Sequence, residues 1–313
     1  MIVSHSHSPV IGRFAPSPTG SLHFGTLVSA LASYVHVRQA GGRWLLRIED
    51  LDPPRVVTGS ADAILFLLET LGFEWDGEIV YQSRRFHRYQ EILQELRHRQ
   101  LVFECTCSRR DLLASAPHAG EEGPVYPGTC RSGADDKRAQ RSLRLRVGDE
   151  PVSFVDGIQG GQCQNLEREV GDFVLYRADG VYAYQLAVVI DDMDGGITQV
   201  VRGADLLFST PRQIWLYRCL NARPPDYYHH PLVLGSDRQK LSKRDGDGGV
   251  IAAANGARML WLALDFLGQS PPSCLFDASP REVLGWGVEH FSIACVGRES
   301  RCVCFDQLDA VQP

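Results

Sequence analysis

The first hundred residues alternate between strand-like and helix-like patterns of hydrophobic positions. An apolar run at residues 10–16 (VIGRFAP) and another at 43–48 (RWLLRI) predict two short strands. Residues 25–39, between them, repeat with a helical period that ends at Gly41-Gly42. A second helix is predicted farther along because five apolar residues share one face: Ala61, Ile64, Leu65, Leu68 and Leu71. Short strands separated by helices favour parallel pairing in an α/β sheet.

The middle of the chain has a different texture. Between residues 101 and 170 Gly, Pro, Cys and Arg become frequent and periodicity falls, which indicates an insertion between two halves of one α/β domain. Ordered patterns return at 171–192, where Asp179-Gly180 predicts a hairpin turn between two apolar runs.

The remaining third predicts two helices, a strand and a loop. Residues 197–203 (ITQVVRG) predict a buried strand, and Thr210 is predicted to cap a helix that Pro211 opens. His229-His230 is expected in a loop. Residues 257–268 (ARMLWLALDFLG) predict one more helix, and the sequence after it is a weakly patterned tail.

Composition is that of an ordinary soluble globular protein, with 44% hydrophobic and 22% charged residues. No apolar run approaches the roughly 20 residues that a membrane span needs, and the first residues lack a signal-peptide pattern. We therefore expect a cytoplasmic location and no membrane partner. Nine cysteines, irregularly spread, make a disulfide scaffold improbable.

The net charge of −6 makes a general nucleic-acid coat protein improbable. It does not exclude RNA, because residues 84–100 and 137–147 are basic stretches inside an acidic chain. Solvated helix and strand faces explain either stretch alone equally well.

One stretch combines features of a phosphate site. Residues 13–26 (RFAPSPTGSLHFGT) run from a predicted strand into a helix that begins near Gly25, whose backbone N–H groups favour anions. Gly20 and Gly25 allow a ligand close to the backbone, and His23 could donate to a phosphate oxygen. A second stretch, KLSKR at 240–244, offers two lysines around a serine that could neutralise a departing pyrophosphate.

Together these stretches resemble the HIGH and KMSKS signatures of class I aminoacyl-tRNA synthetases. RFAPSPTGSLHFGT and RIEDLDPPR (47–55) resemble specifically the glutamyl-tRNA synthetase branch. Thr26 replaces the second histidine of the first signature, and Arg244 replaces the final serine of the second; both replacements are common in that branch. The resemblance covers about residues 10 to 270.

The resemblance implies a catalytic role for His23 and Lys243. It places ATP against His23, Gly25, Lys240, Ser242 and Lys243. A dicarboxylic amino acid needs a guanidinium for its side chain and an acceptor for its ammonium group. The resemblance implies a glutamate site made by Arg13, Phe14, Ala15, Pro16, Ser17, Glu49, Tyr184 and Arg202, with Glu49 receiving the ammonium. Alternatively, Glu49 could pair with Arg47 or Arg55, and Tyr184 could belong to the core.

The chain is further similar to the short paralogues, the glutamyl-Q tRNA(Asp) synthetases, because residues 245–313 leave no length for the anticodon-binding region of a discriminating glutamyl-tRNA synthetase. Members of that family activate L-glutamate with ATP and esterify it onto the queuosine of tRNA(Asp). A monomer is expected. The alternatives are a truncated conventional glutamyl-tRNA synthetase and a catalytically silent synthetase-derived ligand-binding protein.

Three cysteines in the insertion suggest a metal site. Cys105, Cys107 and Cys130 need one more ligand for a tetrahedral zinc site, and spacing alone would first suggest His118. The family pattern places a tyrosine four residues before the last cysteine, and Tyr126 matches it. The resemblance thus implies one structural Zn²⁺, and Mg²⁺ is expected with ATP. Three unrelated free thiols are the alternative.

These inferences predict an α/β fold with a Rossmann-type parallel nucleotide-binding sheet, a zinc-bearing insertion and a short C-terminal helical segment. The two halves of the class I catalytic domain would be residues 1–100 and 171–235, with the insertion at 101–170. Residues 236–313 would contain the KMSKS-type loop, the last helix and the tail, in which Cys295, Cys302 and Cys304 are interpreted as tail cysteines.

Overall fold

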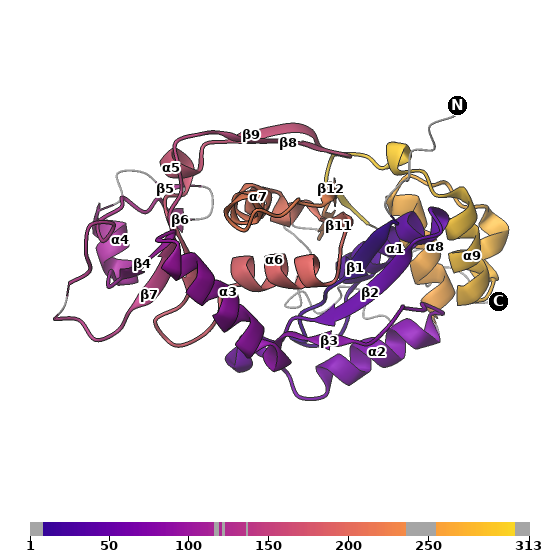
Figure 1. Ribbon diagram of the computed structural model, residues 1–313. Coiled ribbons are helices and arrows are strands. Elements are labelled where there is room, and N and C mark those ends of the chain that lie inside the picture. Colours follow the sequence, from indigo (N-terminus) through magenta and orange to yellow (C-terminus); the bar gives the residue numbers. More distant parts are fainter. Residues whose placement is uncertain (1–8, 116–118, 121–122, 136, 236–254, 304–313) are drawn as a thin grey trace, which may run out of the picture.

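The computed structural model describes residues 9–115, 119–120, 123–135, 137–235 and 255–303. Its centre is a parallel sheet in which β1 (Ile11–Phe14) pairs with β2 (Arg43–Ile48), and β2 pairs with the short β3 (Val80–Tyr81). On the other side of β1 lies a second parallel pair, β11 (Gln199–Gly203) with β12 (Asp226–His230) (Figure 1). The Thr198 N–H donates to the Ile11 carbonyl at 2.8 Å and joins the two groups of strands.

This order creates a switch point beside β1. The chain moves from β1 outward to β2 and β3 on one side, and it later builds β11 and β12 on the other side. In open α/β sheets a crevice forms at the carboxyl ends of the strands where the order reverses. The expected parallel α/β sheet is therefore confirmed, and its topology predicts a ligand site between the ends of β1 and β11.

Helix α1 (Phe24–Gln39) is the central helix of the first half. It packs against β1 and β11 on one side and against the C-terminal helices α8 (Gly256–Phe266) and α9 (Pro280–His290) on the other. Trp44 is fully buried beside Tyr34 and Phe73, with ring centroids 5.0 Å and 5.7 Å away. These aromatic contacts fix β2 against α1.

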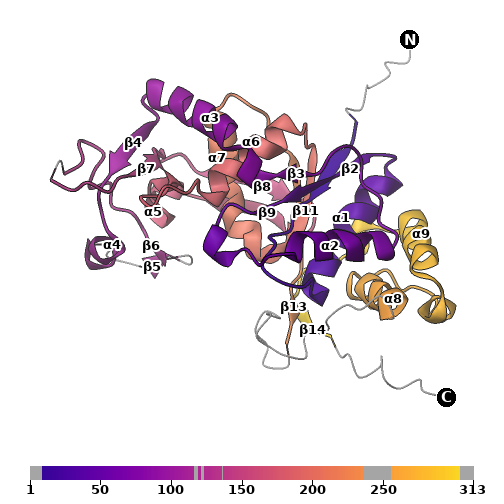
Figure 2. The same cartoon turned by 90° about the horizontal axis from the view of Figure 1, so that it is seen from below.

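Segment 101–170 forms the far end of the molecule, opposite α8 and α9 (Figure 2). Its antiparallel sheet has the order β10-β7-β4, and β10 comes from the chain after the segment. The bounds are β4 (Val102–Cys105), β7 (Ser142–Leu145) and β10 (Phe173–Tyr176). A hairpin of β8 (Val152–Asp156) and β9 (Gly160–Gln164) runs back toward β12.

The other elements complete the frame. The remaining helices are α2 (Ser60–Thr70), α3 (Phe86–His98), α4 (Arg109–Ser115), α5 (Leu166–Glu169), α6 (Tyr184–Asp194) and α7 (Thr210–Cys219). The remaining short strands are β5 (Ala119–Gly120), β6 (Gly123–Pro124), β13 (Val233–Leu234) and β14 (Arg301–Cys302). Short 3₁₀ helices include η1 (Pro53–Arg55), η2 (Gln82–Arg84), η3 (Ala204–Ser209), η5 (Ser273–Asp277) and η6 (Ile293–Cys295). No helix in these ranges is long and apolar enough to cross a membrane.

The predicted helices at 25–39, 61–71 and 257–268 and the predicted strands at 43–48 and 197–203 are confirmed within a few residues. The turn at Asp179-Gly180 is also confirmed, because the Arg177 N–H donates to the Val181 carbonyl and Gly180 has a φ of 88°. The apolar run after that turn does not form the second strand of a hairpin. Only Tyr182 bridges back to β10, and α6 begins at Tyr184.

Three other expectations are wrong. Thr210 is the first residue of α7 rather than its cap, because its hydroxyl bonds to the Leu206 carbonyl and to Arg202. His229-His230 is not a loop but the buried end of β12. No helix was predicted for residues 280–290, where α9 begins with a capping box between Ser279 and Glu282.

Gly12 provides a test of how β1 packs on α1. A Cβ at this position would lie 2.4 Å from Cγ2 of Val37, a buried β-branched side chain that has little freedom to move. Gly12→Ala should therefore lower the free energy of unfolding by about 1–3 kcal/mol, measured by chemical denaturation. Gly161, in β9, has no heavy atom within 4 Å of such a Cβ, so Gly161→Ala is the matched control. Equal stability of the two variants would contradict the close packing.

Candidate active site

A cleft of about 650 Å³ opens where β1 and β11 end. It is lined by residues from both halves of the parallel sheet, from the loop before α1 and from the start of α6. Every predicted glutamate-binding residue lies on its wall, together with His23 and Gly25: Arg13, Phe14, Ala15, Pro16, Ser17, Glu49, Tyr184 and Arg202. The sequence expectation did not include several other lining residues, among them Thr19, Thr26, Ser29, Arg55, Asp205, Leu206 and His230.

The loop between β1 and α1 is tied to its surroundings by backbone contacts. The Glu49 N–H donates to the Pro16 carbonyl at 3.0 Å, and the Val57 N–H donates to the Pro18 carbonyl at 2.9 Å. Ser60, at the start of α2, donates its hydroxyl to the Gly20 carbonyl and accepts from the Gly20 N–H. Gly20 has a φ of 128°, which favours glycine. These hydrogen bonds and the conformation of Gly20 therefore hold the loop between β1 and α1 in one conformation.

His23 stands at the N-terminus of α1, with an extended backbone conformation. Its Nε2 lies 3.0 Å from Oγ1 of Thr26, so the threonine that replaces the second histidine of the signature orients the first. The first turn of α1 contains no acidic residue. The positive dipole end of α1 therefore lies at the cleft without an acidic residue in its own first turn, which suits a phosphate group.

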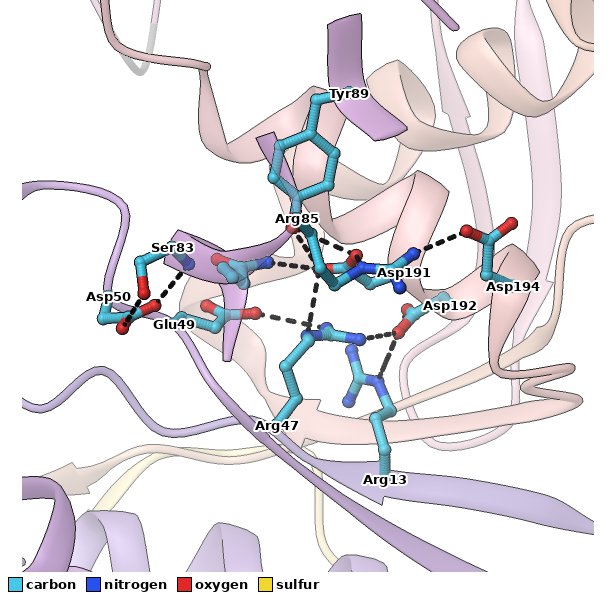
Figure 3. A network of polar contacts seen from close by, with 11 residues as sticks. Arg13, Arg47, Glu49, Asp50, Ser83, Arg85, Tyr89, Asp191, Asp192 and Asp194 are labelled. Atoms are coloured by element: carbon cyan, nitrogen blue, oxygen red, sulfur yellow. Dashed lines mark hydrogen bonds and ion pairs between the residues drawn. The ribbon is translucent and has the colours of Figure 1, made fainter. Parts of the chain in front are cut away.

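Beneath the cleft, two arginines share one carboxylate (Figure 3). Asp192 of α6 accepts from Nε of Arg13 at 3.2 Å and from Nη1 of Arg47 at 2.6 Å, and all three side chains are buried. Arg47 also donates to Oε1 of Glu49 at 3.2 Å. The alternative of a Glu49–Arg47 pair is thus present in the structure, and Glu49 also lines the cleft.

Burial and charge act in opposite directions on these acids. Burial opposes ionisation of Asp192, but Arg13 and Arg47 hold its pKa below the usual value. For Glu49 burial prevails, and it raises the pKa despite Arg47 and Arg13. A cationic ligand group beside Glu49 would favour its ionised form, as the ammonium of an amino acid would.

The network continues from the cleft to the surface of α3. Asp191 is buried and accepts from Nε2 of Gln82 at 2.7 Å, from the Tyr89 hydroxyl and from Nε of Arg85 at 2.6 Å. Arg85 then pairs with Asp194, which lies at the end of α6. The two adjacent aspartates of α6 therefore join β1 and β2 to the helix that leads into segment 101–170.

Arg202 has a different environment. Its Nε donates to Nε2 of His229 at 2.9 Å, and its Nη2 donates to Thr210 and Gln213. His229 in turn donates from Nδ1 to Oδ2 of Asp156 at 2.6 Å. Burial lowers the pKa of His229 to about 4, although Asp156 acts to raise it. His229 is therefore neutral near pH 7, and the Arg202 Nη1 atom is buried without a hydrogen-bond partner among the described residues.

The three cysteines of segment 101–170 singled out in the sequence come together. The Sγ atoms of Cys105, Cys107 and Cys130 all lie within 4.8 Å of one another. The Tyr126 hydroxyl accepts from the Cys130 N–H at 2.9 Å, and the Arg144 guanidinium lies 4.0 Å from the centre of the Tyr126 ring. Burial of the Cys105 thiol acts to raise its pKa, but hydrogen bonds from Tyr126 and from the Cys107 backbone lower that pKa to about 7. Such a thiol is a good metal ligand.

Several residues singled out in the sequence lie outside the described residues: Lys240, Ser242, Lys243 and Arg244 of the KLSKR stretch, the alternative metal ligand His118 and the tail cysteine Cys304. The exposed cysteines Cys295 and Cys302 are far along the chain from the cluster, in η6 and β14.

The basic stretches are partly neutralised by ion pairs within the chain. In 84–100, Arg85 and Arg88 pair with Asp194, and Arg97 pairs with Glu104. In 137–147, Arg138 pairs with Asp111 and Arg141 pairs with Glu104. The arginine count of either stretch therefore overstates the charge available to an RNA phosphate.

Comparison with known proteins places this geometry in a family. Residues 9–255 match the family model for tRNA synthetases class I (E and Q), catalytic domain. A glutamyl-Q tRNA(Asp) synthetase of Dechloromonas aromatica is 50% identical over 295 residues, covering 94% of this chain and 98% of that protein. The chain belongs to the glutamyl-Q tRNA(Asp) synthetase family. The family expected from the signature stretches is thereby confirmed.

Other relatives agree with this family membership. A glutamyl-Q tRNA(Asp) synthetase of Geobacter sulfurreducens is 51% identical over 301 residues, covering 94% of this chain and 96% of its own. Among solved structures, a glutamate tRNA ligase of Elizabethkingia meningosepticum in complex with its amino acid matches with a TM-score of 0.78 and 25% identity. That match covers 96% of this chain and 68% of the ligase chain. The class I catalytic fold is thus shown by sequence and by structure.

Sequence reasoning missed Asp192, Asp156 and His229, although each contacts a predicted glutamate-binding arginine or its partner. The doubled aspartate at 191–192 was a signal, because two carboxylates in an otherwise apolar helical run need buried partners. The doubled histidine at 229–230 was a similar signal.

Asp192→Asn should destabilise the protein by roughly 3–5 kcal/mol, because it leaves two buried guanidinium groups without their shared charge. Asp194→Asn is the control: its carboxylate is partly exposed and pairs with Arg85 and Arg88, so the cost should be about 0–1 kcal/mol. Urea unfolding followed by circular dichroism measures both. An Asp192→Asn cost no larger than that of the control would contradict the role of the shared carboxylate.

Proposed function

We propose that the protein activates L-glutamate with ATP to glutamyl-adenylate and then transfers the glutamyl group to the queuosine base in the anticodon loop of tRNA(Asp). The observation that supports the glutamate specificity is the cleft of Arg202, Arg13 and Glu49, whose charges match an amino acid with a second carboxylate. Roughly 50% identity to glutamyl-Q tRNA(Asp) synthetases over nearly their full length supports the acceptor.

Binding of glutamate would use both signs of charge. The side-chain carboxylate would meet Arg202, whose Nη1 hydrogens are unpaired among the described residues. The ammonium group would meet Glu49, which is 11% exposed and whose ionised form a cationic neighbour stabilises. Tyr184 and Arg13 would border the same site, and residues 14–17 would contribute the backbone wall. This arrangement discriminates against glutamine, because a neutral amide would leave a buried guanidinium uncompensated.

Activation joins the glutamate α-carboxylate to the α-phosphorus of ATP. An oxygen of the carboxylate attacks in line, the bond from the α-phosphorus to the bridging oxygen breaks, and pyrophosphate departs. His23 and the N-terminus of α1 would stabilise charge on the phosphates, and by the resemblance Lys240, Ser242 and Lys243 would do the same for the leaving group. Mg²⁺ would accompany ATP, and we assign it no protein ligand.

In the second step a hydroxyl of the queuosine cyclopentene diol attacks the adenylate carbonyl carbon. The ester forms, AMP leaves and the hydroxyl proton is released. No side chain lining the cleft within the described residues is assigned as its general base. The cis-diol resembles the terminal ribose of tRNA, so the same adenylate chemistry serves both acceptors.

The cysteine cluster would hold one structural Zn²⁺ with Cys105, Cys107, Cys130 and Tyr126 as ligands. The three thiols are close enough to share one ion, and the Tyr126 hydroxyl lies beside them, 2.9 Å from the Cys130 nitrogen. When bound, the metal supplies a cross-link between β4 and the chain around residue 130. The four-segment division, with this site in the insertion at 101–170, remains our proposal for the domain organisation.

The acceptor is tested by mapping labelled glutamate on purified tRNAs. We expect label on queuosine-containing tRNA(Asp), none on the same tRNA with guanosine at that position, and none on tRNA(Glu). Nuclease digestion locates the label, and Lys243→Ala serves as a variant that should lose about 10²–10³-fold in rate. Label on the 3′-terminal adenosine of tRNA(Glu) would instead favour a truncated glutamyl-tRNA synthetase. Absence of glutamate-dependent ATP–pyrophosphate exchange would favour a catalytically silent protein.

Metal analysis tests the zinc proposal, and we expect about one zinc per chain. Cys105→Ser should lose the metal, whereas Cys302→Ser, whose thiol lies in β14, should retain it. Tyr126→Phe should weaken zinc retention against a chelator more than His118→Ala does. Full zinc content in Cys105→Ser would overturn the ligand set, and the reverse order of the last two variants would favour His118.

A further inference from the structure

The buried arginines of the cleft differ in what compensates their charge. Arg13 and Arg47 share Asp192, and Arg47 also pairs with Glu49. No ion pair joins Arg202 to a carboxylate within the described ranges. Its partners are neutral acceptors: the imidazole of His229, the Thr210 hydroxyl, the Gln213 amide oxygen and the Leu206 carbonyl. Arg202 is only 5% exposed, so its charge is neither solvated nor neutralised by the protein.

The hydrogen bond to His229 fixes a tautomer. Nε of Arg202 always bears a hydrogen, so Nε2 of His229, 2.9 Å away, must accept it. Nδ1 must then bear the imidazole proton, and it donates to Oδ2 of Asp156 at 2.6 Å. The acceptor that orients Arg202 therefore exists only while Asp156 receives the proton of the opposite nitrogen.

Asp156 is itself held in one orientation. Its Oδ1 accepts three backbone N–H groups, from Ile158 at 3.0 Å, Gln159 at 2.8 Å and His229 at 3.1 Å. Asp156 is 2% exposed and His229 is 0% exposed, so water does not compete for these bonds. The carboxylate stands at the end of β8, in the segment that the sequence texture indicates as an insertion.

We propose that Asp156 and His229 are positioning residues that set the amino-acid specificity: they orient Arg202 through a neutral acceptor and so leave its charge for the side-chain carboxylate of the substrate. This inference rests on the proposed glutamate activation. A direct Asp–Arg202 contact would neutralise the guanidinium in advance, as Asp192 does for Arg13. The neutral imidazole of His229 orients the Arg202 guanidinium through a hydrogen bond but places no negative charge beside it.

Asp156→Asn tests the relay, by which we mean the hydrogen-bonded chain from Asp156 through His229 to Arg202. Asparagine has nearly the same shape as aspartate, so the change alters hydrogen bonding more than packing. The amide oxygen must face the three backbone N–H groups, so the amide nitrogen faces His229 and donates to Nδ1. The imidazole then bears its proton on Nε2, which meets the Arg202 Nε hydrogen donor to donor. A wrong tautomer produced by such an Asp→Asn change is known to disable a catalytic histidine.

ATP–pyrophosphate exchange is the readout, with glutamate, glutamine and ATP varied separately. For Asp156→Asn we expect the KM for glutamate to rise about 10–100-fold and the preference for glutamate over glutamine to fall. The KM for ATP should stay within about twofold of the wild-type value. Asp226→Asn, an exposed residue at the start of β12, is the matched control and should behave as the wild type does.

A pair of histidine variants gives a second test. The side-chain amide of His229→Gln can place an acceptor where Nε2 lies, whereas the shorter amide of His229→Asn reaches only the position of Nδ1. We expect His229→Gln to retain more glutamate affinity and selectivity than His229→Asn. This comparison decides the question even where Asp156→Asn fails to fold.

Three results would overturn the proposal: wild-type glutamate KM and selectivity in folded Asp156→Asn, equal losses toward glutamate and ATP, or identical behaviour of the two histidine variants. Failure of the proposed function has a different signature. In that case the wild-type protein itself would show no glutamate-dependent exchange, and the tRNA mapping would give no label.

Discussion

The carboxylate of Asp192 is the contact on which the cleft depends. Two guanidinium groups, from Arg13 on β1 and Arg47 on β2, are buried against it, and burying a charge is tolerable only with a partner in good geometry. Because Asp192 belongs to α6, this contact fixes the helix across the two strands. Tyr184 begins the same helix and thereby reaches the cleft wall. Asp191, its neighbour, extends the same constraint to α3 through Gln82, Tyr89 and Arg85.

Two kinds of buried arginine follow from this arrangement, and they suit different tasks. Arg47 is a structural cation whose charge is satisfied inside the protein before any ligand arrives. Arg202 is held by neutral groups, so a bound carboxylate completes its environment. The cost of burying an uncompensated guanidinium is the physical source of selectivity, since a charged substrate side chain removes that cost and a neutral one does not.

The sequence predicted what depends on local patterns and failed where distant residues meet. The glycines, prolines and His23 of the first signature stretch identified the loop before α1, and periodicity located α1, α2 and α8. Asp156 and His229 are 73 positions apart and form their bond only in the folded chain. The sequence alone therefore predicts a loop at His229, because a histidine pair after a tyrosine pair has no apolar pattern. Helix α9 was missed for a related reason: Val283, Leu284 and Gly287 are its buried residues, too few to produce a strong helical pattern.

The hydrogen-bonded chain from Asp156 through His229 to Arg202 also connects segment 101–170 to the amino-acid site. Strand β4, which ends at Cys105, lies at the end of the molecule away from α8 and α9, whereas the β8–β9 hairpin extends from that end to β12 (Figure 1). Most of the hairpin is superficial, and Val155 is 79% exposed, yet the next residue is the buried Asp156. One end of this surface hairpin is thus buried, because the Asp156 carboxylate accepts hydrogen bonds from three backbone N–H groups and from the His229 imidazole. Because Asp156 determines the tautomer beside Arg202, the segment contributes to the amino-acid site through this carboxylate, independently of any metal at the cysteines near β4.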